Sequence, residues 1–235
     1  IRSMLNDEVV YTKTNINDTD IVKNNADKLL LELHFDERIN ANQYRFLTEF
    51  KSQCPLFYGI LKTQSGCPLR PIVSQTNGPT SMISRYLSEI LFVAEKQIPH
   101  ILQDTTAFLN IIKSKNKVDE NTLLVTLDVT PLYTNIPQEE GANWVTEFYS
   151  ETLSQWSNYS PGLLPVKPET VKEMILFVLK NSTFEFDNDF YVQNYGTTMG
   201  SSFSVRFANI YMHQFLKNFF QKHPSLKPEY VARLI

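Results

Sequence analysis

The stretch Leu123-Leu-Val-Thr-Leu-Asp-Val-Thr-Pro-Leu-Tyr-Thr-Asn-Ile-Pro137 decides how the rest of the chain is interpreted. Its apolar, β-branched first half predicts a buried strand over 122–128. The strand ends on one carboxylate, Asp128, and a turn that carries Tyr133 follows. A lone acid at the end of a core strand is costly unless it is paired or holds a cation, and hard cations prefer carboxylate oxygens. Asp128 is therefore a candidate Mg²⁺ ligand, and capping of the following turn is the alternative that the pattern alone leaves open.

The composition indicates a globular protein with an uneven distribution of charge. The 235 residues are 42% hydrophobic and 20% charged, which is typical of soluble domains, and no apolar run approaches the ~20 residues of a membrane span. The net charge of −3 argues weakly against a nucleic-acid binder. Residues 51–117, however, hold eight cations and three anions, so a basic segment could follow a phosphate backbone. A solvated helical face is the alternative for Lys113, Lys115 and Lys117.

The order of elements predicts an α+β fold, a small antiparallel sheet flanked by helices. Apolar residues at helical spacing predict two helices within 22–50. They also predict one helix in each of the ranges 79–94, 105–112, 168–180 and 202–221, and another that begins near Gln138. Alternation around Asp187-Asn-Asp189 predicts a hairpin over 183–193, and a short strand is expected at 71–74. The two cysteines, Cys54 and Cys67, form neither a zinc site nor a disulfide framework, so we expect reduced thiols in an intracellular protein.

Four segments together resemble one protein family, the reverse transcriptases of Penelope-like retroelements. They are Phe57-Tyr-Gly-Ile-Leu-Lys-Thr-Gln-Ser-Gly-Cys-Pro-Leu-Arg-Pro-Ile-Val-Ser74 for the fingers motif, Leu127-Asp-Val-Thr-Pro-Leu-Tyr-Thr-Asn-Ile-Pro137 for the first palm motif, Phe184-Glu-Phe-Asp-Asn-Asp-Phe-Tyr-Val-Gln-Asn-Tyr-Gly-Thr-Thr-Met-Gly-Ser201 for the hairpin and glycine loop, and Ala208-Asn-Ile-Tyr-Met212 for the following helix. The resemblance implies a right-hand polymerase in which 1–120 form an N-terminal helical region and the fingers, and 121–235 form a partial palm, with the thumb absent.

The resemblance also implies an activity and a set of site residues. The activity is RNA-directed DNA polymerisation, with an RNA template, a DNA primer, deoxynucleotide triphosphates and two Mg²⁺ ions as partners, in an intracellular, nuclear setting. Asp128 and the carbonyl of Val129 are expected to hold metal, and Tyr133 to exclude a 2′-hydroxyl, with a core tyrosine as its alternative. The residues expected to contact substrate are Lys62 and Arg70 at the triphosphate, Met199 at the nucleotide, Gly200 at the nascent base pair, and Gln193, which steadies the loop.

The chain also departs from the family pattern. The family has two prolines where this chain has Ser201-Ser-Phe-Ser-Val205, and Arg206 is a charge where the family is apolar. Leu61, Gln64 and Ser65 replace the usual neighbours of Lys62. Arg233-Leu-Ile235 matches the lead-in to the paired aspartates, so we expect the chain to stop just before them and to be inactive or nearly so. The alternatives are a nucleic-acid-binding fragment without chemistry and a fragment without function.

Overall fold

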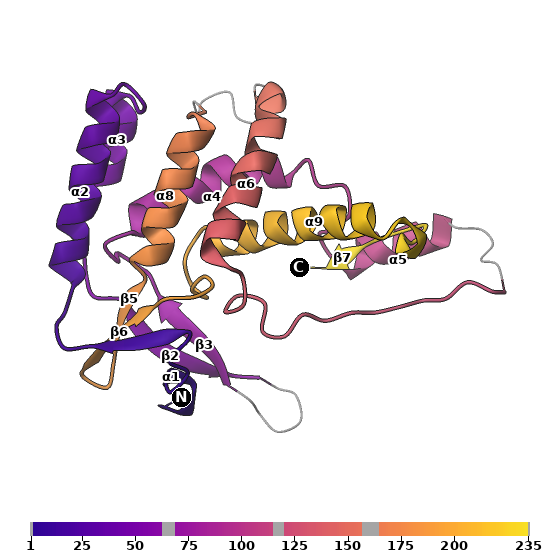
Figure 1. Ribbon diagram of the computed structural model, residues 1–235, viewed down its shortest axis with the longest axis horizontal. Helices are drawn as coiled ribbons and strands as arrows, with labels where there is room; N and C mark the ends of the chain where they lie inside the picture. Colours follow the sequence, from indigo (N-terminus) through magenta and orange to yellow (C-terminus); the bar gives the residue numbers. More distant parts are fainter. Residues whose placement is uncertain (1, 63–68, 115–119, 157–164, 235) are drawn as a thin grey trace.

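The computed structural model describes residues 2–62, 69–114, 120–156 and 165–234, and within these ranges the chain has an α+β fold (Figure 1). The helices are α1 Arg2–Leu5, α2 Thr19–Phe35, α3 Ala41–Thr48, α4 Ser81–Glu95, α5 Thr105–Ser114, α6 Gln138–Thr152, α8 Pro168–Lys180 and α9 Ser204–Lys222, with 3₁₀ turns at Leu153–Gln155 and Pro224–Leu226. The strands are β1 Tyr11–Thr14, β2 Leu56–Leu61, β3 Leu69–Ser74, β4 Ile101–Leu102, β5 Thr183–Phe186, β6 Asp189–Gln193 and β7 Arg233–Leu234. Cys67, Gln64, Ser65, Lys115 and Lys117 lie outside the described residues.

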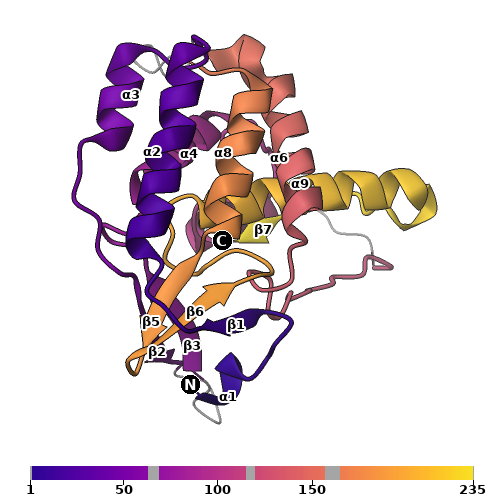
Figure 2. The same cartoon turned by 60° about the vertical axis from the view of Figure 1, so that its left-hand side comes forward.

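The helices form where the apolar spacing predicts them. Helix α4 buries Ile83, Tyr86, Leu87, Ile90 and Leu91 along one face, because residues three and four apart fall on the same side of a helix. Helix α8 begins with Pro168 in its first turn, where a missing amide hydrogen costs no helical hydrogen bond. Figures 1 and 2 show α2, α3, α6 and α8 standing side by side at one end of the sheet. None of the helices described is long and apolar enough to cross a membrane.

The main sheet has five strands in the order β1-β6-β5-β2-β3. The predicted hairpin is confirmed: β5 pairs with β6, and Asp187 and Asn188 at its turn both have positive φ, as a tight hairpin turn requires. The expectation of a purely antiparallel sheet is wrong, because β2 pairs with β5 in parallel. These strands are far apart in sequence, and helices α4, α6 and α8 lie between them along the chain, which gives the long connection that parallel neighbours need.

The strand predicted over 122–128 does not form. Residues 122–129 form neither helix nor strand, and the side chains of Leu123, Leu124 and Leu127 are 82%, 85% and 89% exposed. The expected partner, the hairpin β5–β6, already has β1 on one edge and β2 on the other. Because a strand needs a free edge to pair with, the apolar pattern alone does not make this segment part of the sheet. In Figure 1 it runs below α9 toward the lower right, apart from the helices.

Two apolar clusters hold the fold together. The larger one lies among the helices and includes Leu87 of α4, Tyr149 of α6 and Phe207 of α9. The smaller one lies on the sheet and consists of Leu5, Val10, Tyr11, Phe57, Val73 and Phe184. Both clusters draw on elements from before and after residue 120, so the two regions pack as one body and the division at 120 stays a prediction about function.

Helices α6 and α9 touch at Gly141, and this contact gives a test of the packing. A Cβ placed on Gly141 would lie 2.7 Å from Cζ of Phe207 and 2.9 Å from Cγ2 of Ile136. We expect Gly141→Ala to destabilise the chain by about 1–3 kcal/mol through overpacking, measured by urea unfolding. An unhindered helical glycine would instead gain roughly 0.5–1 kcal/mol on the same change. A gain in stability would therefore contradict this packing.

Candidate functional site

One large cleft, of about 870 Å³, opens between the β2–β3 hairpin and the first half of α9. Segments 128–133 and 199–201 complete its lining. Residues from all four of the segments singled out in the sequence meet there. The sequence-predicted site residues in the lining are Lys62, Arg70, Asp128, Val129, Tyr133, Met199 and Gly200. The cleft is therefore the candidate site.

The loop at Met199–Ser201 is fixed against strand β3. The Val73 amide donates a hydrogen bond of 2.8 Å to the carbonyl of Met199. Gly200 has a φ of +118°, a conformation that residues with a Cβ avoid. A Cβ at Gly200 would lie 2.2 Å from the carbonyl oxygen of Val73. The packing of this loop against β3 is thus sufficient to explain the glycine at position 200, whether or not a ligand also approaches it.

The turn that carries Tyr133 is tied to the same loop. The Thr197 amide donates to the carbonyl of Tyr133 at 2.7 Å, and a Cβ at Gly196 would lie 2.2 Å from that same oxygen. The Gln138 side chain donates to the carbonyl of Gly196 at 3.1 Å. Burial raises the pKa of the Tyr133 hydroxyl, and the positive charge of Arg70 opposes this shift. Tyr133 is thus half-buried, and it lies close enough to Arg70 to feel its charge.

Gln193 is the one predicted site residue that does not line the cleft. Its side chain is buried, and Nε2 donates to the carbonyl of Tyr195 at 2.9 Å. Its backbone amide donates to the carbonyl of Ser182 at 3.0 Å. These contacts suit a residue that steadies the start of the loop 194–201, and they give it no contact with a ligand in the cleft.

Asp128 reaches the cleft from the exposed segment rather than from a buried strand. The Thr130 hydroxyl donates to its Oδ2 at 3.1 Å, which is a contact between two side chains and not a cap on a backbone amide. Asp128 is the only carboxylate in the lining of the cleft within the described ranges, and no cluster of three or more metal-ligating acids, histidines or cysteines occurs among those residues. The described residues therefore do not complete a Mg²⁺ site, since such a site needs several oxygen ligands.

Three further residues of the site were not predicted from the sequence as ligands: Ser204, Asn209 and Arg233 all line the cleft. A buried polar network behind the lining holds two of them. Glu95 of α4 accepts from Asn209 Nδ2 at 2.6 Å, and Arg233 donates to the Asn209 carbonyl at 2.7 Å. No sequence pattern links these positions, because they come from three elements far apart in the chain.

The unusual charge at Arg206 has a structural explanation in the same network. Its guanidinium lies 3.5 Å from the Glu95 carboxylate and donates to the Ser88 hydroxyl at 2.8 Å. It also lies over the ring of Phe92, 5.0 Å from the centroid, where a cation–π contact contributes further. Arg206 therefore joins α9 to α4.

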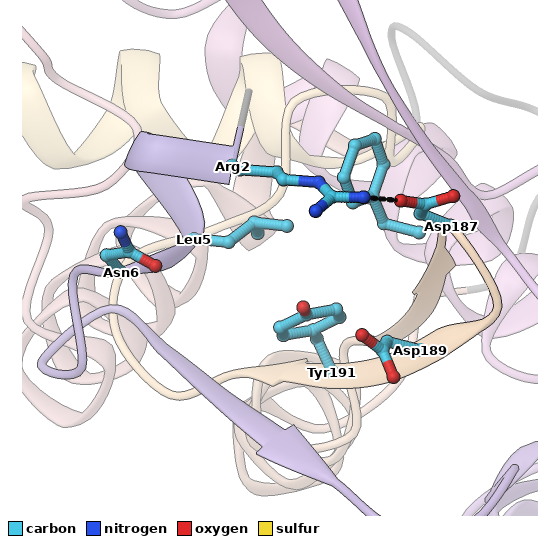
Figure 3. Close-up of a pocket in the computed structure, with 7 residues that line it drawn as sticks. Arg2, Leu5, Asn6, Asp187, Asp189 and Tyr191 are labelled. Atoms are coloured by element: carbon cyan, nitrogen blue, oxygen red, sulfur yellow. Dashed lines mark hydrogen bonds and ion pairs between the residues drawn. The ribbon is translucent and has the colours of Figure 1, made fainter.

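A second, smaller pocket of about 230 Å³ lies between α1 and the β5–β6 hairpin (Figure 3). Figure 3 shows Arg2 directed at Asp187 across its rim, with Asp189 and Tyr191 on the hairpin side. Asp189 in turn pairs with Lys13 at 2.8 Å. Because each carboxylate of this pocket already has a basic partner, the pocket offers no unneutralised charge to a ligand, and the large cleft remains the better candidate.

Two histidines pack together behind the cleft. The rings of His100 and His213 lie 5.0 Å apart, and neither His100 Nε2 nor His213 Nδ1 has a hydrogen-bond partner among the described residues. Burial lowers the pKa of His213 to about 4, and the nearby charges of His100, Arg233 and Lys217 add to this effect, while Glu151 opposes it. Burial and Arg233 also lower the pKa of His100. Both rings are therefore neutral at pH 7.

The histidine pair predicts a loss of stability in mild acid. A histidine in the unfolded chain takes up a proton near its ordinary pKa of 6.5, whereas folded His213 stays neutral until about pH 4, so the unfolded state binds more protons in between and gains stability. We expect the free energy of unfolding to fall between pH 7 and 5, and to fall less in His213→Gln. His223→Gln, at an exposed residue after α9, is the control. Equal pH slopes for both variants in urea unfolding would contradict the prediction.

Comparisons with known proteins leave the identity of the chain open. No protein-family model matches the chain, and no curated protein is significantly similar to it. The resemblance of the four sequence segments to Penelope-like reverse transcriptases therefore stays a hypothesis.

Proposed function

We propose that the chain is the fingers and palm portion of a reverse transcriptase of the Penelope-like kind, and that its cleft binds a deoxynucleotide triphosphate next to a primer–template. One observation carries the proposal. The family resemblance nominates eight site residues from separate motifs, and all of them except Gln193 line a single cleft. The residues were chosen by their motifs and not by their positions in space, so their meeting in one cleft supports the proposal.

The cations of the fingers supply the chemistry for a triphosphate. Lys62 and Arg70 stand at the ends of β2 and β3 on the hairpin side of the cleft. Arginine can bind a phosphate through two parallel hydrogen bonds, and lysine adds a point charge. Both side chains are at least partly accessible, so a ligand can reach them without any change in the fold.

The opposite end of the ligand would lie on Tyr133 and on the loop 199–201. The bond from the Thr197 amide to the Tyr133 carbonyl holds the backbone of Tyr133, and its half-buried side chain lines the cleft where a sugar could pack. Gly200 is exposed and leaves backbone accessible beside Met199. An aromatic side chain and an accessible backbone in the lining suit the selection of a nucleoside by shape.

The described residues of the cleft do not include all the metal ligands that catalysis would need. In template-directed polymerisation, Mg²⁺ ions stabilise the charge that develops on the attacking and leaving oxygens. Asp128 and the carbonyl of Val129 would hold part of such a site, but one carboxylate does not complete it. This same observation favours a second candidate function, in which the chain binds nucleotide or nucleic acid without extending a primer.

If Arg70 binds the triphosphate, substituting Arg70 and substituting Lys113 should change the affinity for a nucleotide by different amounts. Losing one charge-assisted hydrogen bond costs about 1.5–3 kcal/mol, which is roughly a 10- to 150-fold weaker Kd. We expect Arg70→Ala to weaken binding of dTTP by this amount in isothermal titration calorimetry. Lys113→Ala removes an exposed cation of α5 and should change the Kd less than twofold. Equal effects would indicate diffuse electrostatics rather than a site.

Because Asp128 is the one carboxylate in the described lining of the cleft, we predict that the 235-residue chain does not extend a DNA primer on an RNA template. We expect it to bind a labelled primer–template, measured by fluorescence anisotropy, while a gel assay with Mg²⁺ and all four deoxynucleotides shows no extension. Binding with no extension by the chain supports the incomplete metal site. Extension that survives Asp128→Ala would remove Asp128 from the metal site and contradict the proposed arrangement.

A further inference from the structure

Arg233 brings a cation to the cleft from the side opposite to Lys62 and Arg70. It lies in β7, which pairs with β4 in parallel and runs beside α9 in both views (Figures 1 and 2). Its backbone amide donates to the His100 carbonyl at 2.7 Å, and its Nη2 donates to the Asn209 carbonyl at 2.7 Å. The residue is thus fixed at two points while it contributes to the lining of the cleft.

The charges around Arg233 do not balance. Glu95 is the nearby carboxylate, and it already serves Arg206 at 3.5 Å and Asn209 at 2.6 Å. Glu151 pairs with Lys217 at 3.1 Å, and the two histidines behind Arg233 are kept neutral by burial and by that same positive charge. Glu95 is thus ion-paired with Arg206 and acts on Arg233 only through its charge, so Arg233 has no ion pair of its own among the described residues.

The hydrogen-bonding capacity of the Arg233 guanidinium is only partly used. Its Nε and Nη1 are buried and have no acceptor within the described ranges. Burial lowers the pKa of the guanidinium to about 10, and Glu95 opposes the shift, so the group is still charged at neutral pH. A partly buried charge with two of its donor nitrogens unpaired is unfavourable, and an anionic oxygen is the acceptor that would satisfy them best.

We infer that Arg233 is a phosphate-binding residue of the cleft, and that Glu95 competes with the phosphate for its guanidinium. The phosphate could belong to the polyphosphate of a nucleotide or to the backbone of a nucleic acid. The inference rests on the proposed function in one respect, namely that the ligand of the cleft carries phosphate. It adds a second anion position, across the cleft from the one formed by Lys62 and Arg70.

The test compares two phosphate probes in the absence of metal ions. Sodium tripolyphosphate is titrated by calorimetry, and a fluorescein-labelled single-stranded DNA is titrated by anisotropy, both at pH 7. We expect Arg233→Gln to weaken at least one probe tenfold or more. Loss confined to tripolyphosphate assigns the position to a nucleotide, and loss confined to DNA assigns it to a backbone phosphate. The matched control is Arg85→Gln, which removes the same charge from an exposed site on α4 beside Phe46 and should stay within twofold.

A second variant is expected to strengthen phosphate binding instead of weakening it. Glu95→Gln keeps an acceptor for Asn209 and removes the competing charge, so we expect severalfold tighter binding of the probe that Arg233→Gln weakens. If circular dichroism shows that Arg233→Gln does not fold, Glu95→Gln decides: tighter binding of either probe supports the inference, and unchanged or weaker binding of both overturns it.

The outcomes also separate this inference from the proposed function. If Arg233→Gln folds and matches Arg85→Gln in both titrations, Arg233 is not a phosphate ligand. If Arg70→Ala weakens tripolyphosphate binding in that case, the proposed function stands while the inference about Arg233 falls. If the unmodified chain binds neither probe, both are overturned.

Discussion

The close approach of Gly200 to the carbonyl of Val73 is the constraint on which the cleft depends. It brings the loop 199–201 against β3, and the hydrogen bond from the Val73 amide to Met199 locks the two together. Helix α9 begins at Ser204, directly after this loop, so its position is set by the same contact. The strand that carries Arg70 and the helix that carries Asn209 thereby face one space, although more than a hundred residues separate them in the sequence.

A second contact adds the third side of the cleft. The bond from Thr197 to the Tyr133 carbonyl, with Gly196 close beneath it, holds the turn 130–137 against the same loop. Segment 128–133 therefore lines the cleft even though residues 121–129 belong to no sheet. Burying one leucine contributes about 1.5–3 kcal/mol, and the exposed Leu123, Leu124 and Leu127 gain none of it. Local anchoring of the turn, rather than strand pairing, positions Asp128.

The sequence predicts those parts of this fold that are decided locally. Helices such as α4, α8 and α9 follow from apolar spacing, and the β5–β6 hairpin follows from its alternation and its turn. The prediction of a strand over 122–128 was wrong because strand pairing is not decided locally. The residue pattern matches a buried strand, but β1 and β2 already occupy the two edges of the β5–β6 hairpin. The parallel pairing of β2 with β5 is hidden for the same reason, since nothing in either strand specifies which neighbour it takes.

The site shows the same division between local and non-local information. Lys62, Arg70, Tyr133 and Gly200 stand in segments distinctive enough to be singled out from the sequence. Asn209 and Arg233 also lie in such segments, but their contacts with Glu95 and with each other join three separate elements, and no local pattern reveals those contacts.

The charges of the lining then limit what the cleft can hold. Three cations, Lys62, Arg70 and Arg233, face one carboxylate, Asp128, within the described part of the lining. Such a surface attracts an anion with several negative charges and repels a free metal ion, so a cation would enter most readily together with the phosphates that neutralise those side chains. Under the proposed function, binding of Mg²⁺ at this cleft should accordingly depend on prior or simultaneous binding of the phosphate-bearing ligand.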